Sequence, residues 1–337
     1  NVPRKKDEKI VVLGSVTTQL RQLSRYSRVL FVPIPQKPLF STTLGLLVKL
    51  AYAILSFGPQ IVLVYPSYPF GLPSALIARL FRKLHVSFAY GNDLTRRRTR
   101  LGKLLVLLTV RLSHGFICDY EGLAKIVRQM GGRNVTTIPM GIDASDLPSA
   151  RPKRRQNIVM CVVNFNLAYS KGVDLLIQAV KELPDAHLIL IGDGAQRSTM
   201  ISLAKKLHVS QRVTFTGYIP HKEIWTHLMN ATIFALPTRT SISEGTNRAV
   251  LEAMLCGLPV VVTRTGGLPE LIVDGVNGFV VEPENMKDLV KAVLTLLGNP
   301  KLRKRMGDAN RIKAKKYTVN VLTAKRYEYL ETLIRSA

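Results

Sequence analysis

The feature that most constrains the fold is an alternation of short β-rich apolar runs with longer amphipathic stretches, which the chain shows twice. Strands that are separated by helical connections pair in parallel. Continuous apolar runs are typical of strands that are covered on both faces of a parallel sheet. We therefore predict an α/β protein with two Rossmann-like domains, whose parallel sheets face each other across a cleft.

Twelve runs are predicted as strands, six in each half of the chain. In the first half they span 28–34, 60–66, 85–91, 115–120 and 135–141, after a first run at 9–14. In the second half they span 157–163, 186–192, 212–217, 233–238, 259–263 and 278–283. Helices are predicted at 17–26, 43–57, 72–84 and 101–113.

A polar, basic and Pro-containing segment, DASDLPSARPKRRQ at 143–156, is typical of a linker between domains. We expect a first domain over 1–150 and a second over 151–318. The helical pattern at 319–337 has no later strand to pack against, so we expect this helix to cross back to the first domain.

The charge balance favours anionic partners. The net charge is +26, and between Glu8 and Asp119 the one acidic residue, Asp93, stands among fifteen Lys and Arg. Such a field attracts phosphates, nucleic acid or acidic lipid headgroups, but does not choose among them. A generally basic proteome is the alternative explanation.

The sequence also bears on the compartment. The cysteines are Cys118, Cys161 and Cys256, with neither metal-site spacing nor a disulfide pattern, so a reducing compartment is expected. No signal-peptide pattern opens the chain. The most apolar stretch, 43–57, contains Lys49 and is shorter than a membrane span. We expect a cytoplasmic protein, either free or peripheral on the inner face of the cell membrane.

Two acids, Glu244 and Glu252, stand eight positions apart in an otherwise apolar segment. Glu244 is expected in the loop before a helix, with Glu252 about two turns into it. The amides of Gly245, Thr246 and Asn247 are predicted to form an anion site at the start of that helix. A carboxylate beside such a site suits the hydroxyls of a sugar. The alternative is that neither acid binds a ligand, with Glu244 an N-cap-like acid and Glu252 an exposed helical residue.

Other strand-to-helix turns carry groups that suit a phosphorylated ligand. Lys171 precedes Gly172 at a helix start and could reach a phosphate. Gly192 and Gly194 permit a close backbone approach, although a tight turn explains them equally well. Tyr218 and Ile219 are available to contact a base.

These stretches together resemble the family-4 retaining glycosyltransferases of the GT-B fold. The resemblance rests on SKGVDLLIQAV, LIGDGAQR, FTGYIP and EGTNRAVLEAMLCGLPVVVTRTGGLPELIVDGVNGFVVEP, and covers 155–300. It implies that the first domain binds the acceptor and the second a UDP- or GDP-linked sugar, with no metal and no other cofactor. Glu244 would contact the donor sugar, Glu252 the ribose, and Lys171 the diphosphate. The leaving phosphate would assist deprotonation of the acceptor.

Three departures from the family pattern stand out. Asn166 replaces an Arg that clamps the diphosphate; Arg197 or Arg239 could compensate. Tyr90 stands where many relatives have a His. Asp93 retains the acid that follows this position in the family, and it either lines the cleft or is a plain N-cap of the next helix. The turn after Gly14 lacks a Gly-Gly pair, although Gly14 could still approach the phosphates.

The acceptor is suggested by a basic run that leads into an apolar helix. Its members are Arg96, Arg97, Arg98, Arg100 and Lys103. They could dock on acidic lipid headgroups or a polyprenyl-phosphate acceptor, or form a solvated turn before a core helix. Three other interpretations stay open: a non-catalytic sugar-nucleotide binder, a nucleic-acid-binding protein and a GT-B-fold epimerase. The lack of a zinc-finger, RRM or basic-zipper pattern weighs against nucleic acid.

Overall fold

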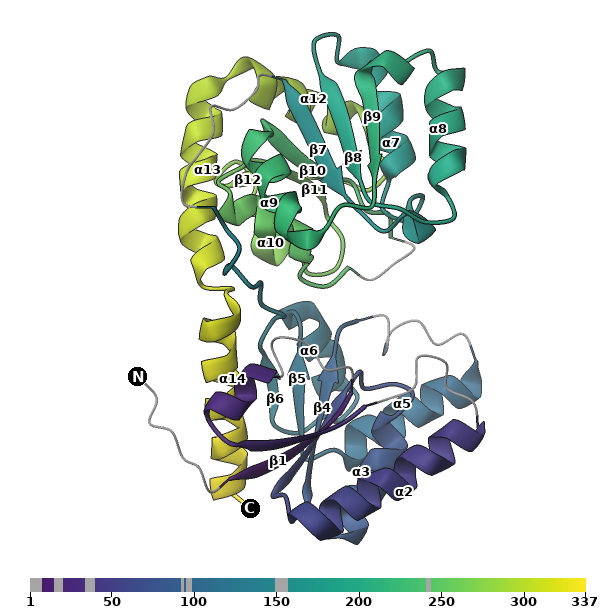
Figure 1. The fold of residues 1–337 in the computed structure, drawn as a ribbon, viewed down its shortest axis with the longest axis vertical. Helices are drawn as coiled ribbons and strands as arrows, with labels where there is room; N and C mark the ends of the chain where they lie inside the picture. Colours follow the sequence, from purple (N-terminus) through teal and green to yellow (C-terminus); the bar gives the residue numbers. More distant parts are fainter. Residues whose placement is uncertain are drawn as a thin grey trace. The chain divides into compact units, whose positions relative to one another are not determined.

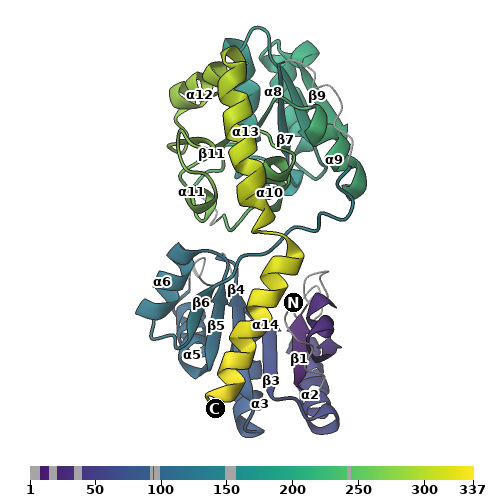
Figure 2. The same cartoon turned by 90° about the vertical axis from the view of Figure 1, so that its left-hand side faces the viewer.

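The chain forms two compact units, each built on a six-stranded parallel sheet (Figures 1 and 2). The computed structural model describes residues 8–14, 21–33, 40–91, 94, 99–148, 157–240 and 244–337. The first domain consists of Asn1–Gly141 and Thr318–Ala337, and the second consists of Ile142–Tyr317.

The first domain has the strand order β2-β1-β3-β4-β5-β6. Its strands are β1 (Lys9–Gly14), β2 (Arg28–Val32), β3 (Ile61–Tyr65), β4 (Leu84–Ala89), β5 (Gly115–Cys118) and β6 (Val135–Thr137). Every pairing is parallel. The chain moves from β1 to the outer strand β2 and then returns across the sheet, so the order reverses between β1 and β3.

Helices cover both faces of this sheet. They are α2 (Phe40–Phe57), α3 (Gly71–Leu80), α5 (Arg100–Leu112), α6 (Glu121–Gln129), α14 (Val319–Arg335) and the short η1 (Gln22–Arg25). The connections from β2 to β6 all step in the same direction across the sheet. Because such connections are right-handed, their helices α2, α3, α5 and α6 lie on one face of the sheet. The C-terminal helix α14 packs with η1 on the other face (Figures 1 and 2).

The second domain has the strand order β12-β11-β10-β7-β8-β9, again with parallel pairings. Its strands are β7 (Ile158–Val162), β8 (His187–Ile191), β9 (Val213–Gly217), β10 (Ile233–Leu236), β11 (Val260–Thr263) and β12 (Gly278–Val281). Strands β10 and β11 are buried along their whole length, as expected for a sheet covered on both faces.

Seven α-helices connect or flank these strands among the described residues. They are α7 (Val173–Ala179), α8 (Arg197–Lys206), α9 (His221–Asn230), α10 (Arg248–Leu255), α11 (Leu268–Leu271), α12 (Met286–Gly298) and α13 (Pro300–Lys315). Three 3-10 turns complete the domain: η2 (Phe165–Leu167), η3 (Val180–Glu182) and η4 (Ser210–Arg212). Apolar side chains of these strands and helices form one large hydrophobic core, which covers both sides of the sheet.

All twelve predicted strands are confirmed, with ends that differ by a few residues. The helix predicted at 17–26 lies outside the described residues up to residue 20; within them Arg21 is α-helical and Gln22–Arg25 form the 3-10 turn η1. The predicted helix at 72–84 ends early, at Leu80, because Arg82 adopts a left-handed φ of 52°. The Lys83 amide then donates to the Ala78 carbonyl at 2.7 Å, which closes the helix as a glycine usually does.

The first domain boundary lies earlier than the sequence suggested. Ile142 is buried in the core of the second domain, and its amide donates to the Tyr317 carbonyl at 2.9 Å. Residues from 142 onward therefore belong to the second domain, rather than those from 151. The expectation that the two sheets face each other across a cleft stays a prediction.

Candidate functional site

The site predicted from sequence lies at the carboxyl edge of the second domain's sheet. Strand β7 is paired with β10 on one side and β8 on the other, so the strand order reverses at β7. In open α/β sheets, ligands bind beyond the strand ends at such a switch point. Lys171 follows β7 and Glu244 follows β10, so the two residues come from the two loops that flank this point.

Lys171 and Glu244 form an ion pair in which Nζ of the lysine donates to Oε2 of the glutamate. Their side chains are only 13% and 8% exposed. Gly172 makes this arrangement possible, because it has a φ of 71° and a Cβ there would lie 2.1 Å from the Pro237 carbonyl oxygen. Only a glycine lets the loop after β7 pack this closely on the end of β10.

The Glu244 carboxylate is held by two further side chains. Thr238 donates its hydroxyl to Oε2 at 3.3 Å, and Asn247 donates its amide to Oε1 at 2.9 Å. Below the pair lies Cys161 on β7, whose thiol pKa is raised to about 12 by burial and further by Glu244, although Lys171 opposes the shift. The thiol therefore stays protonated and takes no part in charge balance at neutral pH.

The backbone of Glu244 rests on a turn that the sequence analysis did not single out. The Gly267 amide donates to the Glu244 carbonyl at 2.8 Å. Gly266 has a φ of 53°, and a Cβ at this position would lie 1.8 Å from the same carbonyl oxygen. The signal is visible in the sequence as the Gly-Gly pair of RTGGLPEL.

Helix α10 begins later than predicted, because Asn247 is its N-cap and accepts a hydrogen bond from the Val250 amide at 3.1 Å. Gly245 and Thr246 consequently precede the helix, which corrects the prediction that their amides lie at its start. Asn247 couples the helix to the site, since the same side chain also donates to Glu244.

Glu252 lies about one turn into α10, not two, and is 4% exposed. Nε2 of His221 lies 2.8 Å from its Oε1. His221 begins α9, just after Tyr218 and Ile219 at the end of β9. Tyr218 is 78% exposed and Ile219 is half-buried. Sequence reasoning missed His221, because its partner is 31 residues away.

Asn166 ties two of the predicted ligand loops together. Its Oδ1 accepts a hydrogen bond from the Ala195 amide at 2.8 Å. Gly192 and Gly194 have positive φ, and a Cβ at Gly194 would lie 2.5 Å from the Asn166 nitrogen. A Cβ at Gly192 would lie 1.9 Å from the Val163 carbonyl oxygen. The glycines are required by close packing between the loops after β7 and β8.

Of the two candidates to replace the missing arginine, Arg239 is already engaged. Its guanidinium donates to both Asp174 oxygens at 2.7 and 2.8 Å and to Glu284 at 2.9 Å, and these carboxylates raise its pKa. Arg197 is half-buried and donates to the Phe215 carbonyl at 3.3 Å, whereas its Nε has no hydrogen-bond partner among the described residues. Of the two guanidinium groups, that of Arg197 is therefore the less engaged by the described residues.

The acceptor-side predictions fall at the carboxyl edge of the first domain's sheet. Gly14 ends β1 and is in register with Tyr65 on β3. Tyr90 follows β4; its ring lies edge-on to that of Tyr65, with centroids 4.5 Å apart, and its hydroxyl donates to Sδ of Met140 at 3.1 Å. Four predicted residues lie outside the described residues: Asp93, Arg96, Arg97 and Arg98.

A buried arginine stands beneath this aromatic group. Arg326 of α14 is 1% exposed, and its guanidinium carbon lies 5.5 Å from the centre of the Phe88 ring. It donates through Nη2 to the Pro139 carbonyl, while Nε and Nη1 have no hydrogen-bond partner in the described part of the chain. Burial lowers its pKa to about 10, and the nearby carboxylate of Asp119 opposes the shift.

Neither a metal nor a membrane span emerges from the described residues. Within them, no three His, Cys, Asp or Glu side chains are grouped so that they could hold a metal ion. No helix in the described ranges is long and apolar enough to cross a bilayer.

Comparison with protein families finds a match to the family described as glycosyl transferases group 1, over residues 146–313. Among curated relatives, a GDP-mannose-dependent alpha-(1-6)-phosphatidylinositol monomannoside mannosyltransferase of Mycolicibacterium smegmatis is 36% identical over 52% of this chain and 50% of its own length. An uncharacterized glycosyltransferase of Methanocaldococcus jannaschii is 27% identical over 79% of this chain and 73% of its own. The chain thus spans about half the length of the first relative.

Solved structures match the whole fold at low identity. Sucrose-phosphate synthase from Thermosynechococcus elongatus superposes with a TM-score of 0.80 at 17% identity, covering 98% of this chain and 100% of that one. The Anabaena protein HepE in complex with UDP gives a TM-score of 0.80 at 18% identity, over 96% and 100% of the two chains. These likenesses establish the fold, which is GT-B, as the sequence motifs predicted.

Proposed function

The chain belongs to the glycosyl transferases group 1 family, and from this premise we propose that it transfers a sugar from a nucleotide-diphosphate sugar to an acceptor hydroxyl. The observation that carries the proposal is the Lys171–Glu244 ion pair at the switch point of the second domain's sheet. An ammonium group suits a diphosphate, and the adjoining carboxylate suits the hydroxyls of a sugar.

The ion pair gives the reaction a physical basis. Breaking the bond between sugar and phosphate places negative charge on the departing diphosphate. Lys171 is already held at the strand ends by Glu244, so it can stabilise that charge without reorganising at the moment of reaction. A donor that binds here adds its phosphates as a second set of partners for the ammonium group. Arg197, whose Nε has no hydrogen-bond partner among the described residues, can contribute a further charge.

We further propose that the sugar is transferred with retention of configuration. Glu244 is engaged by Lys171, Thr238 and Asn247, an arrangement suited to orienting hydroxyls rather than to nucleophilic attack. The leaving phosphate would then accept the acceptor's proton on the same face of the sugar. Asp93, in the first domain, is proposed to orient the acceptor.

The donor and the acceptor are proposed from the relatives' names. Two relatives are described as GDP-mannose-dependent and as acting on phosphatidylinositol monomannosides, including one of Corynebacterium glutamicum that is 33% identical over 52% of this chain. We propose a GDP- or UDP-linked sugar, with GDP-mannose first, and a lipid-linked acceptor. Such an acceptor would place the protein peripherally on the cytoplasmic face of the cell membrane.

The proposal is tested with a panel of nucleotide sugars and a membrane lipid extract as acceptor. Transfer is expected with one donor, and Glu244→Gln is expected to reduce the rate at least about a hundredfold, because the sugar loses its charged partner. The matched control is Glu282→Gln, an exposed carboxylate that pairs with Arg264. Unchanged transfer by Glu244→Gln would refute the role given to this site.

A second candidate function is a non-catalytic sugar-nucleotide binder. It is favoured by Asn166, which occupies the place of an arginine and accepts a hydrogen bond from the Ala195 amide. It is also favoured by Arg239, whose guanidinium is hydrogen-bonded to both oxygens of Asp174. This alternative predicts that GDP or UDP raises the melting temperature while no donor in the panel is consumed. Salt-sensitive DNA binding without stabilisation by nucleotides would instead favour a nucleic-acid-binding protein.

A further inference from the structure

The outer surface of α2, α3 and α5 exposes an unusual number of large apolar side chains. Of nine such side chains among the described residues before 142, eight belong to these three helices. They are Val48, Tyr52 and Leu55 on α2, Leu76 and Leu80 on α3, and Leu101, Leu104 and Leu108 on α5, with exposures from 37% to 77%. Isolated exposed leucines are ordinary, but a contiguous group is not.

The exposed side chains form stripes that point away from the sheet. Val48, Tyr52 and Leu55 follow the spacing i, i+4, i+7, which keeps them on one side of α2. The buried Leu46 and Leu50 occupy the opposite side of that helix, against the core. Helix α3 contacts both α2 and α5, so the three helices lie side by side in one layer (Figure 1). We call their outer surface the basic apolar face.

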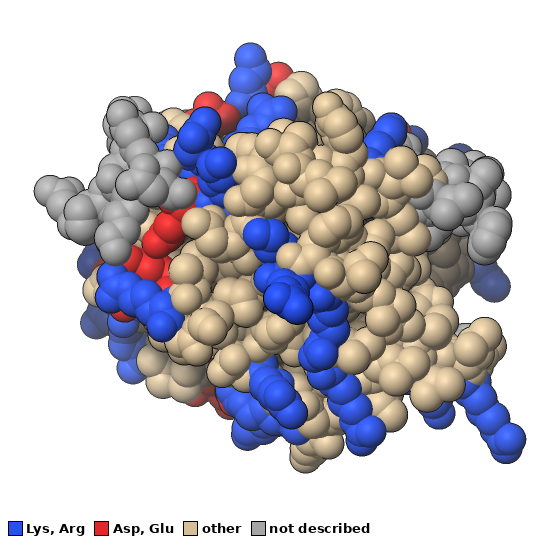
Figure 3. Space-filling view, turned by 90° about the horizontal axis from the view of Figure 1, so that it is seen from below, with Lys and Arg blue, Asp and Glu red and all other residues tan. Residues whose placement is uncertain are grey.

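The charge of this face has one sign. None of the three helices contains an Asp or a Glu. Exposed cations stand among the apolar side chains, namely Lys49, Arg79, Arg100, Lys103 and Arg111. Figure 3, which views the molecule from below, shows Lys and Arg side chains scattered over a surface that is largely uncharged, with Asp and Glu near its margin.

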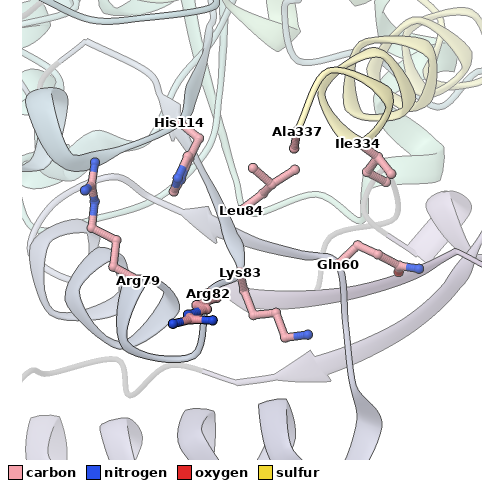
Figure 4. A pocket seen from close by; sticks show the side chains of 8 residues that line it. All are labelled: Gln60, Arg79, Arg82, Lys83, Leu84, His114, Ile334 and Ala337. Atoms are coloured by element: carbon pink, nitrogen blue, oxygen red, sulfur yellow. The ribbon is translucent and has the colours of Figure 1, made fainter.

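A basic hollow lies where α3 ends. It has a volume of about 640 Å³, and Arg79, Arg82, Lys83 and His114 contribute its basic side chains (Figure 4). None of the described residues that line it has an acidic side chain. Nδ1 of His114 accepts the His85 amide at 3.0 Å, so the other ring nitrogen is left to donate. The hollow adds a site for an anionic group at the edge of the basic apolar face.

We propose that the basic apolar face docks on an anionic phospholipid bilayer. The apolar side chains would enter the boundary between headgroups and acyl chains, while the lysines and arginines contact lipid phosphates. Long basic side chains suit this arrangement, because their stems lie along apolar surface and their charged ends reach the headgroups. The inference deepens the proposed function and rests on it for the lipid acceptor, but docking can be measured without any sugar transfer.

The direction of the helices fits a reaction at the membrane surface. Helix α5 starts from the carboxyl edge of the first domain's sheet, after Tyr90, and α3 starts at the same edge, after β3. A bilayer along this helical layer would therefore run past the edge that carries Gly14, Tyr65 and Tyr90. A lipid headgroup could reach that edge without leaving the membrane.

The chemistry of the face disfavours a protein partner. Protein interfaces are depleted of lysine at their centre, whereas here cations are interspersed with the apolar side chains on each of the three helices. A second copy of the chain would bring the same positive charges together, since a twofold interface pairs one patch with itself. Anionic lipid neutralises the cations and takes up the apolar stripes at the same time.

The test is sedimentation with vesicles of phosphatidylcholine alone or with about a third of phosphatidylglycerol, using the whole chain. The wild type is expected to bind the anionic vesicles and to lose binding at high salt. Tyr52→Ser combined with Leu55→Gln and Leu80→Gln should weaken partitioning at least about a hundredfold. Lys49→Glu combined with Lys103→Glu should weaken it at least about tenfold.

Matched controls use exposed positions in the second domain. Leu294→Gln with Ile312→Gln, and Lys181→Glu with Lys205→Glu, should bind vesicles as the wild type does. Stabilisation by GDP or UDP should be the same in all variants, which separates a docking defect from failure of the nucleotide site or of folding. Equal binding to both vesicle types, no binding, or a dimer that the apolar variants dissociate would overturn the proposal.

Discussion

The two domains carry very different groups at the carboxyl edges of similar sheets. In the second domain, Lys171 and Glu244 meet at the strand ends and retain 13% and 8% of their side-chain exposure. In the first domain, the described residues at the corresponding edge are mainly aromatic, with Tyr65 and Tyr90 in contact and Arg326 buried beneath them. The second domain's edge presents opposite charges near its surface, while the first domain's edge encloses a cation within the fold.

This difference indicates that the charges of the second domain serve ligand binding, whereas the buried cation of the first domain serves stability. The charges of the second domain are held by glycine-dependent loops, such as the turn at Gly266, and stay within reach of solvent. The cation of the first domain lies near a buried carboxylate, Asp119, whose Oδ1 accepts the Met140 amide at 2.7 Å. We therefore expect substitutions at the second domain's edge to change activity strongly, and those around Arg326 to change stability.

The largest effect is expected at Gly266, a residue that supports Glu244 through the backbone alone. In Gly266→Ala the new Cβ meets the Glu244 carbonyl oxygen and must displace the glutamate. A shift of about 1 Å in a positioned group can lower the rate about a hundredfold. Transfer measured with the best donor of the panel should fall by at least this factor.

The control is Gly275→Ala, at a glycine with a φ of 72° and no atom within 4 Å of the place that a Cβ would occupy. It carries the same backbone strain without crowding Glu244, and should retain activity within about threefold. If both variants lost activity equally, backbone strain alone would explain the loss and the role of the turn would be rejected.

A smaller effect, on stability, is expected for Arg326→Met. The substitution keeps most of the buried volume but leaves the Asp119 carboxylate, 1% exposed, without its nearby cation. Leaving a buried carboxylate without a compensating cation costs about 3 kcal/mol or more. Hydrogen exchange of amides in β5 and α14 should therefore accelerate, while nucleotide binding by the second domain is unchanged. Arg335→Met, on the exposed end of the same helix, should cost less than about 1 kcal/mol.

The sequence predicted the sheets well, because strands buried on both faces leave continuous apolar runs that do not depend on distant contacts. The end of α3 could not be predicted in this way, since Arg82 and not a glycine adopts the left-handed conformation there. The boundary at Ile142 depends on a hydrogen bond to Tyr317, which no local pattern reveals. The predicted start of α10 is too early, because the sequence does not reveal that the Asn247 side chain caps the helix.

The site was predicted in part for the same reason. Lys171 and Glu244 carry local signals, a Lys-Gly pair and an acid before a helix, and the structure brings them together. The partner of Glu252, His221, could not be predicted, because the contact joins two segments that are 31 residues apart. Arg326 gave no signal, because a basic residue in an amphipathic helix is normally exposed.

The central claim is that Lys171 holds the diphosphate of the donor, and calorimetric titration of Lys171→Met tests it most directly. The variant should bind GDP or UDP, whichever the wild type prefers, at least about tenfold more weakly, because the diphosphate loses a charged partner. Binding of the corresponding nucleoside, which has no phosphate, should not change. Equal affinity of wild type and variant for the nucleoside diphosphate would contradict the role of Lys171.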